Sequence, residues 1–312
     1  MIQEPIIDPV DTEEIVAELT PDRFLRHTNK GGNEIYVVDA HTAPAIMREV
    51  GRLREIAFRQ GGGGTGKSCD IDEFDLMDRP CKQLIVWDPD SQLILGGYRV
   101  ITGKEMSRDA DGVPNIAMSH MFRFSPKFLE EYLPNVMELG RSFVRIGYQS
   151  SRFGSKAIYV LDNLWDGLGA LTVEDRDIKY LLGKVTMYPN YIVHCRNMLL
   201  YFLNKHFPDP DELVRPIEPL ETGTDEEEMA KIFVGKNFKE DYRILNTRIR
   251  EHGINIPPLV NSYMSLSPTM KIFGTAINKE FGDVEETGIF FAIEDIFEEK
   301  KQRHIGSYKG SK

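Results

Sequence analysis

The spacing of hydrophobic positions along this chain changes between two periods, and each period predicts a different kind of element. Four apolar residues recur at steps of four, three and four, with charged residues between them: Ile46, Val50, Leu53 and Ala57. This is the period of an amphipathic helix. Further helices are predicted at residues 126–132, 156–171, 191–207 and 238–251.

Shorter apolar runs, bounded by turn residues, predict the strands of a sheet. These runs are residues 84–88, 93–100, 136–144, 178–185 and 289–293. The first two flank Pro89-Asp90-Ser91, a sequence suited to a hairpin turn. Because helices and strands are mixed without strict alternation, we expect an α/β fold of the α+β kind. Its central sheet should be mixed, mainly antiparallel and flanked by helices.

The length of 312 residues exceeds the usual size of a single domain, which is roughly 100 to 200 residues. Residues 1–207 contain most of the predicted elements and are expected to form the core. Residues 208–229 contain four prolines and the acidic run Asp225–Glu228, so they resemble an exposed connector. Residues 230–312 would then form a C-terminal extension that completes the core or packs on it.

A net charge of −11 argues against nucleic acid as a partner. The three cysteines, Cys69, Cys81 and Cys195, form no CxxC or Cys/His pattern, so we expect no metal site. The first residues are acidic and lack the apolar core of a signal peptide, and no apolar run approaches the ~18 residues that cross a bilayer. These features predict a cytoplasmic protein and leave contact with the surface of the inner membrane open.

Residues 61–68 read Gly-Gly-Gly-Gly-Thr-Gly-Lys-Ser and match the phosphate-loop pattern G-x-x-x-x-G-K-[ST] in every letter. A nucleotide-binding loop of this kind follows a buried strand and precedes a helix. Here a predicted helix precedes the glycines, and five carboxylates follow within the nine residues 70–78. We therefore interpret the loop as a hinge that ends a helix and leads an acidic segment to a site.

Two charged residues, Glu138 and Arg141, interrupt the apolar strand predicted at residues 136–144. Charges seldom lie in buried strands unless they are paired or used chemically. Three positions apart, they would face opposite sides of a regular strand, whereas a bulge at Gly140 would bring both to one side. An internal ion pair and a functional role both stay open for Arg141. Function is favoured for Glu138, because carboxylates with shifted pKa values often mark sites.

Several motifs, taken in sequence order, resemble a known acyltransferase superfamily. They are Arg54-x-x-x-Phe58, Asp70-Ile71-Asp72-Glu73-Phe74-Asp75, Gly97-Tyr98-Arg99, Glu138-Leu139-Gly140-Arg141-Ser142-Phe143-Val144 and Ile256-Pro257-Pro258-Leu259-x-x-x-Tyr263. Together they resemble the GNAT-fold superfamily that includes the N-acylhomoserine-lactone synthases. They are more similar still to its N-acyl amino acid synthases, the ornithine-lipid and glycine-lipid acyltransferases often labelled hemolysin-like.

The resemblance implies a GNAT-like fold and transfer of a fatty acyl group, often 3-hydroxyacyl, to the α-amine of glycine or ornithine. The implied donor is a thioester on an acyl carrier protein. Acyl-phosphopantetheine would therefore be the co-substrate, with acyl-coenzyme A as the other option, and no covalently bound cofactor is implied. The expected partners are the acyl carrier protein and a small amino acid.

This chemistry fits the residues, because the amine of an amino acid is mostly protonated at neutral pH and must lose a proton before it attacks. Glu138, desolvated on its strand, would have a raised pKa suited to a general base. Arg141 is expected beside it at the catalytic centre, and amides exposed by the bulge would stabilise the oxyanion. Arg54, Arg99 or Arg141 would pair with the substrate carboxylate. Asp72 and Asp75 would hold the ammonium or orient those arginines. The expected substrate-binding residues are Arg54, Phe58, Asp72, Asp75 and Arg99.

Members of the superfamily that use acyl-coenzyme A usually carry a [RQ]-x-x-G-x-[GA] loop after the central strand. Here residues 149–154 read Gln-Ser-Ser-Arg-Phe-Gly, which suits the single phosphodiester of a carrier protein better than a diphosphate. Residues 139–161 also contain four cations and no acid, as expected of a surface that docks an acidic carrier protein. The residues expected to dock the donor are Arg145, Arg152, Gly154 and Lys156.

Three alternatives stay open. An N-acylhomoserine-lactone synthase is disfavoured, because those chains are considerably shorter and lack the Ile-Pro-Pro-Leu region. The other two belong to different classes. One is a nucleotide-binding switch built on residues 61–68, and the other is a non-catalytic acyl-binding scaffold that keeps the fold without turnover.

Overall fold

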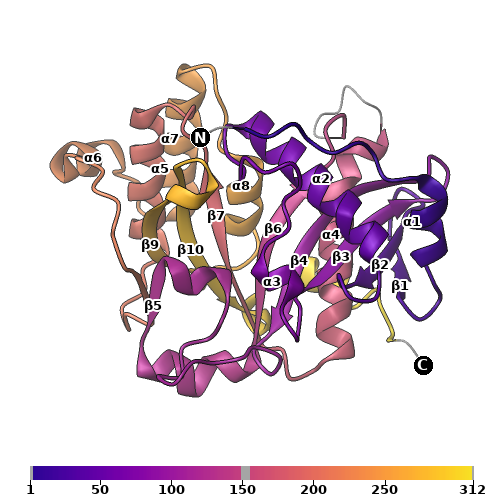
Figure 1. The fold of residues 1–312 in the computed structure, drawn as a ribbon. Coiled ribbons are helices and arrows are strands. Elements are labelled where there is room, and N and C mark those ends of the chain that lie inside the picture. Colours follow the sequence, from indigo (N-terminus) through magenta and orange to yellow (C-terminus); the bar gives the residue numbers. More distant parts are fainter. Residues whose placement is uncertain (1–2, 149–154, 311–312) are drawn as a thin grey trace.

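Eight strands form one continuous sheet in the computed structural model, which describes residues 3–148 and 155–310 (Figure 1). Across the sheet the strands are β1 (Phe24–His27), β2 (Glu34–Val38), β3 (Lys82–Asp88), β4 (Leu93–Thr102), β6 (Val136–Val144), β7 (Tyr180–Met187), β10 (Val284–Ala292) and β9 (Lys271–Asn278). Neighbouring strands are antiparallel except β6 and β7, which run parallel. The predicted mixed, mainly antiparallel sheet is confirmed.

Helices cover both faces of the sheet. One face is covered by α1 (Thr12–Glu18), α2 (Pro44–Gly61) and α3 (Glu73–Leu76). The opposite face is covered by α4 (Ser155–Glu174), α5 (Val193–His206), α7 (Phe238–Glu251) and α8 (Pro258–Met264), with α6 (Glu226–Ile232) against α5 and α9 (Glu298–His304) against α4. Among the described residues, none of the helices combines the length and the apolar character that a membrane crossing requires.

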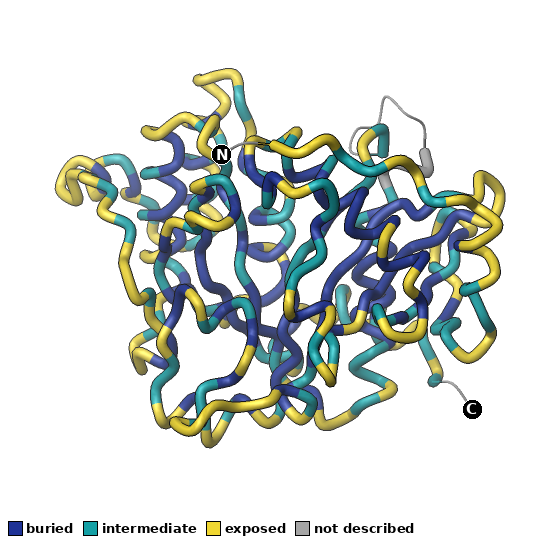
Figure 2. Tube along the Cα trace, in the orientation of Figure 1, coloured by how far each residue is buried: buried dark blue, intermediate teal, exposed yellow. Residues whose placement is uncertain are grey.

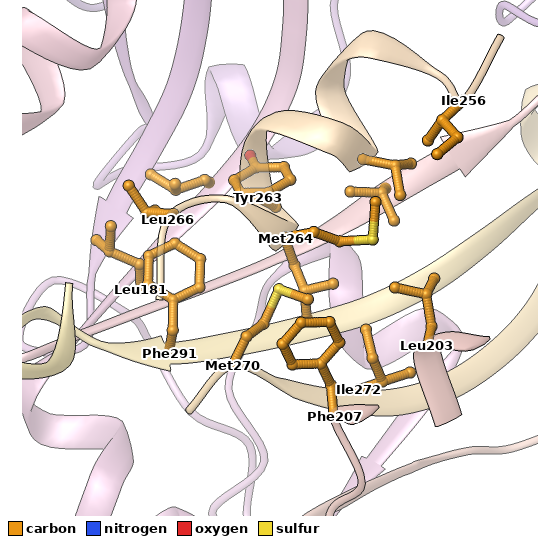
Figure 3. Packing of buried hydrophobic residues seen from close by; sticks show 14 of the residues in the cluster. Leu181, Leu203, Phe207, Ile256, Tyr263, Met264, Leu266, Met270, Ile272 and Phe291 are labelled. Carbon is orange, nitrogen blue, oxygen red and sulfur yellow. The ribbon is translucent and has the colours of Figure 1, made fainter. Parts of the chain in front are cut away.

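The hydrophobic core lies between the sheet and these two layers, where the buried parts of the trace are concentrated (Figure 2). The apolar stripe that predicted α2 is buried against the sheet, so the period of the sequence located this helix and its inner face correctly. On the opposite face, Tyr263 and Met264 of α8 pack with Leu181 of β7 and Phe291 of β10 (Figure 3). Residues far apart in the sequence therefore share one core.

Three strands of the large sheet were not predicted, namely β1, β2 and β9. Strand β1 is a short edge strand, and β9 forms the other edge, so each presents part of its surface to solvent and its sequence lacks a continuous apolar run. Strand β10 begins five residues before its predicted start, because Glu285 and Glu286 interrupt the apolar pattern. A small second sheet pairs β5 (Phe122–Phe124) with β8 (Val214–Pro216), and β8 belongs to the stretch expected as a connector.

Candidate active site

The candidate site lies where β6 and β7 separate. The two strands pair in parallel from Val136 opposite Tyr180 to Leu139 opposite Gly183, and both then continue without pairing to each other. A cavity of about 640 Å³ opens there, and most of its wall is apolar or aromatic. The wall includes Phe58, Phe143, Met187, Tyr188, Tyr191, Leu259 and Tyr263. A cavity of this size and lining suits a long apolar ligand.

A β-bulge places two charged side chains on this cavity. The register between β4 and β6 shifts next to Gly140, where β6 carries one residue more than β4 between consecutive pairs. Arg141 lies in this extra segment with a φ of 48°, in the left-handed region that residues with side chains rarely adopt. Glu138 and Arg141 consequently line the same cavity, so the bulge predicted at Gly140 is confirmed.

Glu138 is a buried carboxyl whose surroundings favour its protonated form. Its Oε1 accepts a hydrogen bond from the Met118 amide at 3.3 Å, and the residue is only 7% exposed. Burial raises the pKa of Glu138, and the positive charges of Arg99 and Lys184 oppose this effect only in part. A raised pKa makes the carboxylate a stronger base than an ordinary carboxylate, as the role of a general base requires.

Arg54 and Asp75, two of the predicted substrate-binding residues, form a fully buried ion pair. Arg54 Nη1 lies 3.2 Å from Asp75 Oδ2, and neither side chain is exposed. Gln83 completes the pair, because it accepts from Arg54 and donates to Asp75 Oδ1 at 2.9 Å. Neither charged residue contributes to the wall of either site cavity that the described residues define. The pair therefore forms a support behind the site.

Asp72 links the other two motif arginines at the cavity surface. Arg99 Nη1 lies 2.5 Å from Asp72 Oδ1, and Arg141 Nη2 lies 3.3 Å from Asp72 Oδ2. Arg141 also pairs with Asp70 at 2.9 Å and lies over the ring of Phe281, 4.5 Å from its centroid. Burial alone would raise the pKa of Asp72, but the guanidinium groups of Arg99 and Arg141 outweigh it and hold this pKa below its usual range.

The N-terminal cap of helix α3 fixes the position of the acidic segment next to the arginines. Asp72 is the N-cap of α3, and its Oδ1 accepts from the amides of Phe74 and Asp75. Asp75 Oδ2 in turn accepts from the Asp72 amide at 3.2 Å, which makes a capping box. The same two carboxylates thus cap a helix and anchor the arginines of the sheet.

A second cavity, of about 480 Å³ and with a more polar wall, adjoins the first. The two cavities share Ala117, Arg141, Lys184 and Phe281. The second wall also carries charged and polar residues from several elements, namely Thr65, Lys67, Asp72, Glu73, His120, Glu218, Asn278, Lys279 and Glu280. The site therefore joins an apolar compartment to a charged one, and Arg141 stands at the junction.

Lys184 and Glu286 are site residues that the sequence analysis missed. Lys184 Nζ lies 2.6 Å from Glu286 Oε2, and both residues line the apolar cavity. The signal was present, because Lys184 interrupts the apolar strand β7 in the same way that Glu138 interrupts β6. Burial would raise the pKa of Glu286, but Lys184 outweighs it and keeps that pKa below its usual value.

The predicted substrate and donor residues are distributed unevenly around the site. Phe58 and Arg99 line the apolar cavity, and the ring of Phe58 lies 5.0 Å from that of Phe281. Arg145 lies on neither cavity wall, and its Nη1 is 3.7 Å from Glu49 Oε1. The remaining donor residues are not placed: Arg152 and Gly154 lie outside the described residues, as does the side chain of Lys156.

The glycine-rich loop at residues 61–68 has none of the surroundings of a phosphate loop. Helix α2 precedes it and ends at Gly61, followed by Gly62 in the left-handed region, and the next described helix is the four-residue α3. The loop is also no free hinge. Buried Glu55 accepts hydrogen bonds from the amides of Thr65 and Gly66 at 3.1 and 2.8 Å and from the Thr65 hydroxyl at 2.8 Å.

The sheet, with one parallel pair that diverges at a bulge, agrees with the sequence comparisons, which place this protein among the acyltransferases of the GNAT class. The family model described as the acetyltransferase (GNAT) domain matches residues 53–157. Two curated relatives match almost the whole chain. A glycine N(alpha)-acyltransferase of Bacteroides thetaiotaomicron is 60% identical over 98% of this chain and 90% of its own length. One of Phocaeicola vulgatus is 58% identical over 98% of this chain and 94% of its own length.

The chain therefore belongs to the glycine N(alpha)-acyltransferase family, and the predicted resemblance to N-acyl amino acid synthases is confirmed. Two solved structures are also similar to it. One is the acylhomoserine-lactone synthase LasI, with 12% identity, a TM-score of 0.42 and coverage of 91% of this chain and 100% of that one. The other is the CoA-dependent synthase BjaI with SAM and isopentyl-CoA, with 12% identity, a TM-score of 0.36 and coverage of 88% and 90%.

Proposed function

We propose that this enzyme transfers a fatty acyl group from a thioester to the α-amine of glycine and so forms an N-acylglycine. The observation that carries the proposal is the junction of the two cavities at the bulge of β6. The apolar cavity has room for an acyl chain, and the charged cavity suits a small zwitterion. Glycine is preferred to ornithine, because the two curated relatives are glycine N(alpha)-acyltransferases.

Glu138 acts as the general base in this proposal. Its carboxylate takes a proton from the glycine ammonium, and the free amine attacks the thioester carbonyl to give a tetrahedral oxyanion. Beyond Leu139, amides of β6 on the side facing β7 have no ladder partner among the described strands, so they can donate to this oxyanion. Collapse breaks the carbon–sulfur bond, and protonated Glu138 gives its proton to the departing thiolate. The regenerated Glu138 carboxylate then takes the second proton from the attacking nitrogen and releases it to water, which leaves the neutral amide.

We propose an acyl carrier protein as the donor, in preference to acyl-coenzyme A. Residues 139–161 carry four cations and no acidic residue in a chain of net charge −11, which favours docking of an acidic protein next to β6. The reaction would take place in the cytoplasm. Its product, with a long apolar chain and one carboxylate, would associate with the inner face of the membrane.

A group of hydroxyls in the apolar cavity supports a 3-hydroxyacyl donor. The hydroxyls of Tyr98 and Tyr263 are 3.1 Å apart, and Ser142 hydrogen-bonds to Tyr98. All three residues line the cavity, where an oxygen on the acyl chain would find hydrogen-bond partners that a plain chain would leave unused. Burial raises the pKa of both tyrosines, so they remain protonated donors.

Replacing Tyr263 by Phe is expected to lower kcat/KM for 3-hydroxyacyl donors about tenfold, the value of one hydrogen bond of about 1.4 kcal/mol. The value for unsubstituted donors of the same length should change little, because the ring that packs in the core is retained. Steady-state kinetics with matched donors measures the ratio. A ratio equal to that of the wild type would remove the hydroxyls from donor selection.

The experiment that tests the proposed function supplies the purified protein with palmitoyl and 3-hydroxypalmitoyl donors, each on acyl carrier protein and on coenzyme A. Glycine, ornithine and serine are offered together as acceptors, and mass spectrometry identifies the products. The expected main product is N-(3-hydroxyacyl)glycine from the carrier-bound donor. Formation of an ornithine product alone, or of no amide from any donor, would contradict the proposal.

A further inference from the structure

We propose that Lys67, the lysine of the sequence that mimics a phosphate loop, binds the carboxylate of the acceptor amino acid. This inference rests on the proposed function and adds a specificity-determining residue to it. Lys67 is exposed at the wall of the charged cavity, the same wall that carries Arg141. A carboxylate held there would leave the amine of a small amino acid free to point toward the junction of the two cavities.

The backbone of Lys67 is held in place even though glycines surround it. Besides the bonds to Glu55, its carbonyl accepts from Arg59 Nη2 at 2.6 Å, and its amide donates to the Thr65 hydroxyl at 3.2 Å. Glu4 bonds to both flanking residues, since its amide donates to the Gly66 carbonyl at 2.8 Å and its Oε2 accepts from the Ser68 amide at 2.8 Å. The loop thus holds in place the backbone from which the Lys67 side chain extends.

Glycine at position 63 allows the loop to approach the site closely. A Cβ atom there would lie 2.9 Å from Val284 Cγ1 and 3.0 Å from the ring of Tyr188, so only glycine fits between the loop and strands β7 and β10. Gly282 also packs closely on this residue, since a Cβ atom at position 282 would lie 3.1 Å from Gly63 Cα. The glycines therefore allow close packing of the loop rather than phosphate binding, and this packing places Lys67 at the cavity wall.

The other cations of the charged cavity already have carboxylate partners. Arg141 pairs with two aspartates and Lys184 with Glu286, as described above. Lys279 Nζ lies 3.3 Å from Glu218 Oε2. The ring of His120, which is a cation only when protonated, also lies beside a carboxylate, with Nδ1 3.7 Å from Glu280 Oε2. Lys67 Nζ makes no ion pair with the side chains of residues 3–148 and 159–310, so it is the cation of this wall that can take an added carboxylate without displacing another.

A carboxylate on the same cavity wall fits this arrangement. Glu73, the first residue of α3, also lines the charged cavity, and its side chain is exposed. An amino acid arrives as a zwitterion, so a wall with one available ammonium and nearby carboxylates matches both of its ends. Glu138 then receives the proton that the amine must lose.

The test compares Lys67→Met with Lys104→Met, a control at a half-exposed lysine that pairs with Asp175 and Asp177 and lines neither cavity. We expect Lys67→Met to raise the KM for glycine about fivefold to tenfold, the effect of losing one charge-assisted contact of about 1 to 1.4 kcal/mol, with kcat within a factor of about two. Glycinamide, which lacks the carboxylate charge, should react equally well with wild type and Lys67→Met. Lys67→Arg should retain most of the preference for glycine over glycinamide, and Lys104→Met should leave it unchanged.

Each contrary result has a distinct meaning. An unchanged KM for glycine in Lys67→Met would overturn the assignment. A rise confined to the KM for the acyl donor would also overturn it and would assign the lysine to the phosphate of phosphopantetheine. A wild-type protein that acylates no glycine would refute the proposed function together with this inference, whereas an active wild type with an unaltered Lys67→Met variant would refute the role of Lys67 alone.

Discussion

Replacing Glu138 by Gln is expected to lower kcat for N-acylglycine formation about a thousandfold, within the range that removal of a general base gives. Glutamine keeps the size of the side chain and an oxygen that accepts from the Met118 amide, so the bulge should stay intact. What is lost is the group that removes the proton from the glycine ammonium. The measurement is a single-turnover rate with saturating donor and glycine.

Two controls separate this role from a structural one. Hydroxylamine is largely unprotonated at neutral pH, so it should be acylated by the Glu138→Gln variant far better than glycine is, relative to wild type. In wild type, kcat/KM should fall as the pH drops through the pKa of Glu138. This limb should lie at a higher pH than that of an ordinary carboxyl, because burial raises the pKa. A variant that keeps the wild-type rate, or the same acidic limb, would contradict the assignment.

Replacing Arg54 by Met is expected to lower the free energy of unfolding by about 3 to 5 kcal/mol, because it leaves a buried carboxylate without its partner. Asp75 has no exposed side-chain surface and would keep only the more distant Arg99, at 3.4 Å, and the amide of Gln83. Urea denaturation followed by fluorescence measures the loss. The same change at an exposed position provides the control.

Arg48 lies on the same helix, and its pair with Glu14 is about half exposed on both sides, so Arg48→Met should cost less than about 1 kcal/mol. A normal unfolding free energy for Arg54→Met, combined with a higher KM for glycine, would instead make Arg54 a direct ligand of the acceptor. The sequence motif alone suggested that role. The burial of both partners argues for support of the site.

The sequence predicted the helices and strands whose pattern of apolar residues follows from burial of one or both of their faces. Strands β4 and β6 and helices α2 and α7 were located within a few residues, because their apolar positions alternate with polar ones or form long runs. Strands β1 and β9 were missed, because an edge strand is specified by its neighbour more than by its own sequence. Pairing across the sheet depends on contacts between distant segments, which the local pattern does not encode.

The residues of the site also divide into those that the local sequence indicated and those that only the structure revealed. Glu138 was found because a charge in an apolar strand conflicts with burial, and the bulge was found because Arg141 would otherwise face the wrong side. The depth of Arg54 was not predictable, because a motif carries residue types and spacing but not exposure. The sequence assigned no role to Lys67, because the phosphate-loop interpretation of its segment was rejected. The proposal that it binds the acceptor carboxylate depends on its position on the cavity wall, which only the structure provides.

Some residues of the apolar cavity lie near the end of the sequence, and this has a consequence for the chain during its synthesis. Strand β10 pairs with β7 across a sequence separation of about one hundred residues, and Asn29 Nδ2 donates to the carbonyl of Arg303 at 2.8 Å. Contacts of such separation form late and slow the folding of a chain. A ribosome-bound nascent chain that has not yet reached residue 281 lacks Phe281 and Glu286 of the cavity wall and the whole of β10, so we expect it to hold no acyl chain before its synthesis has passed that segment.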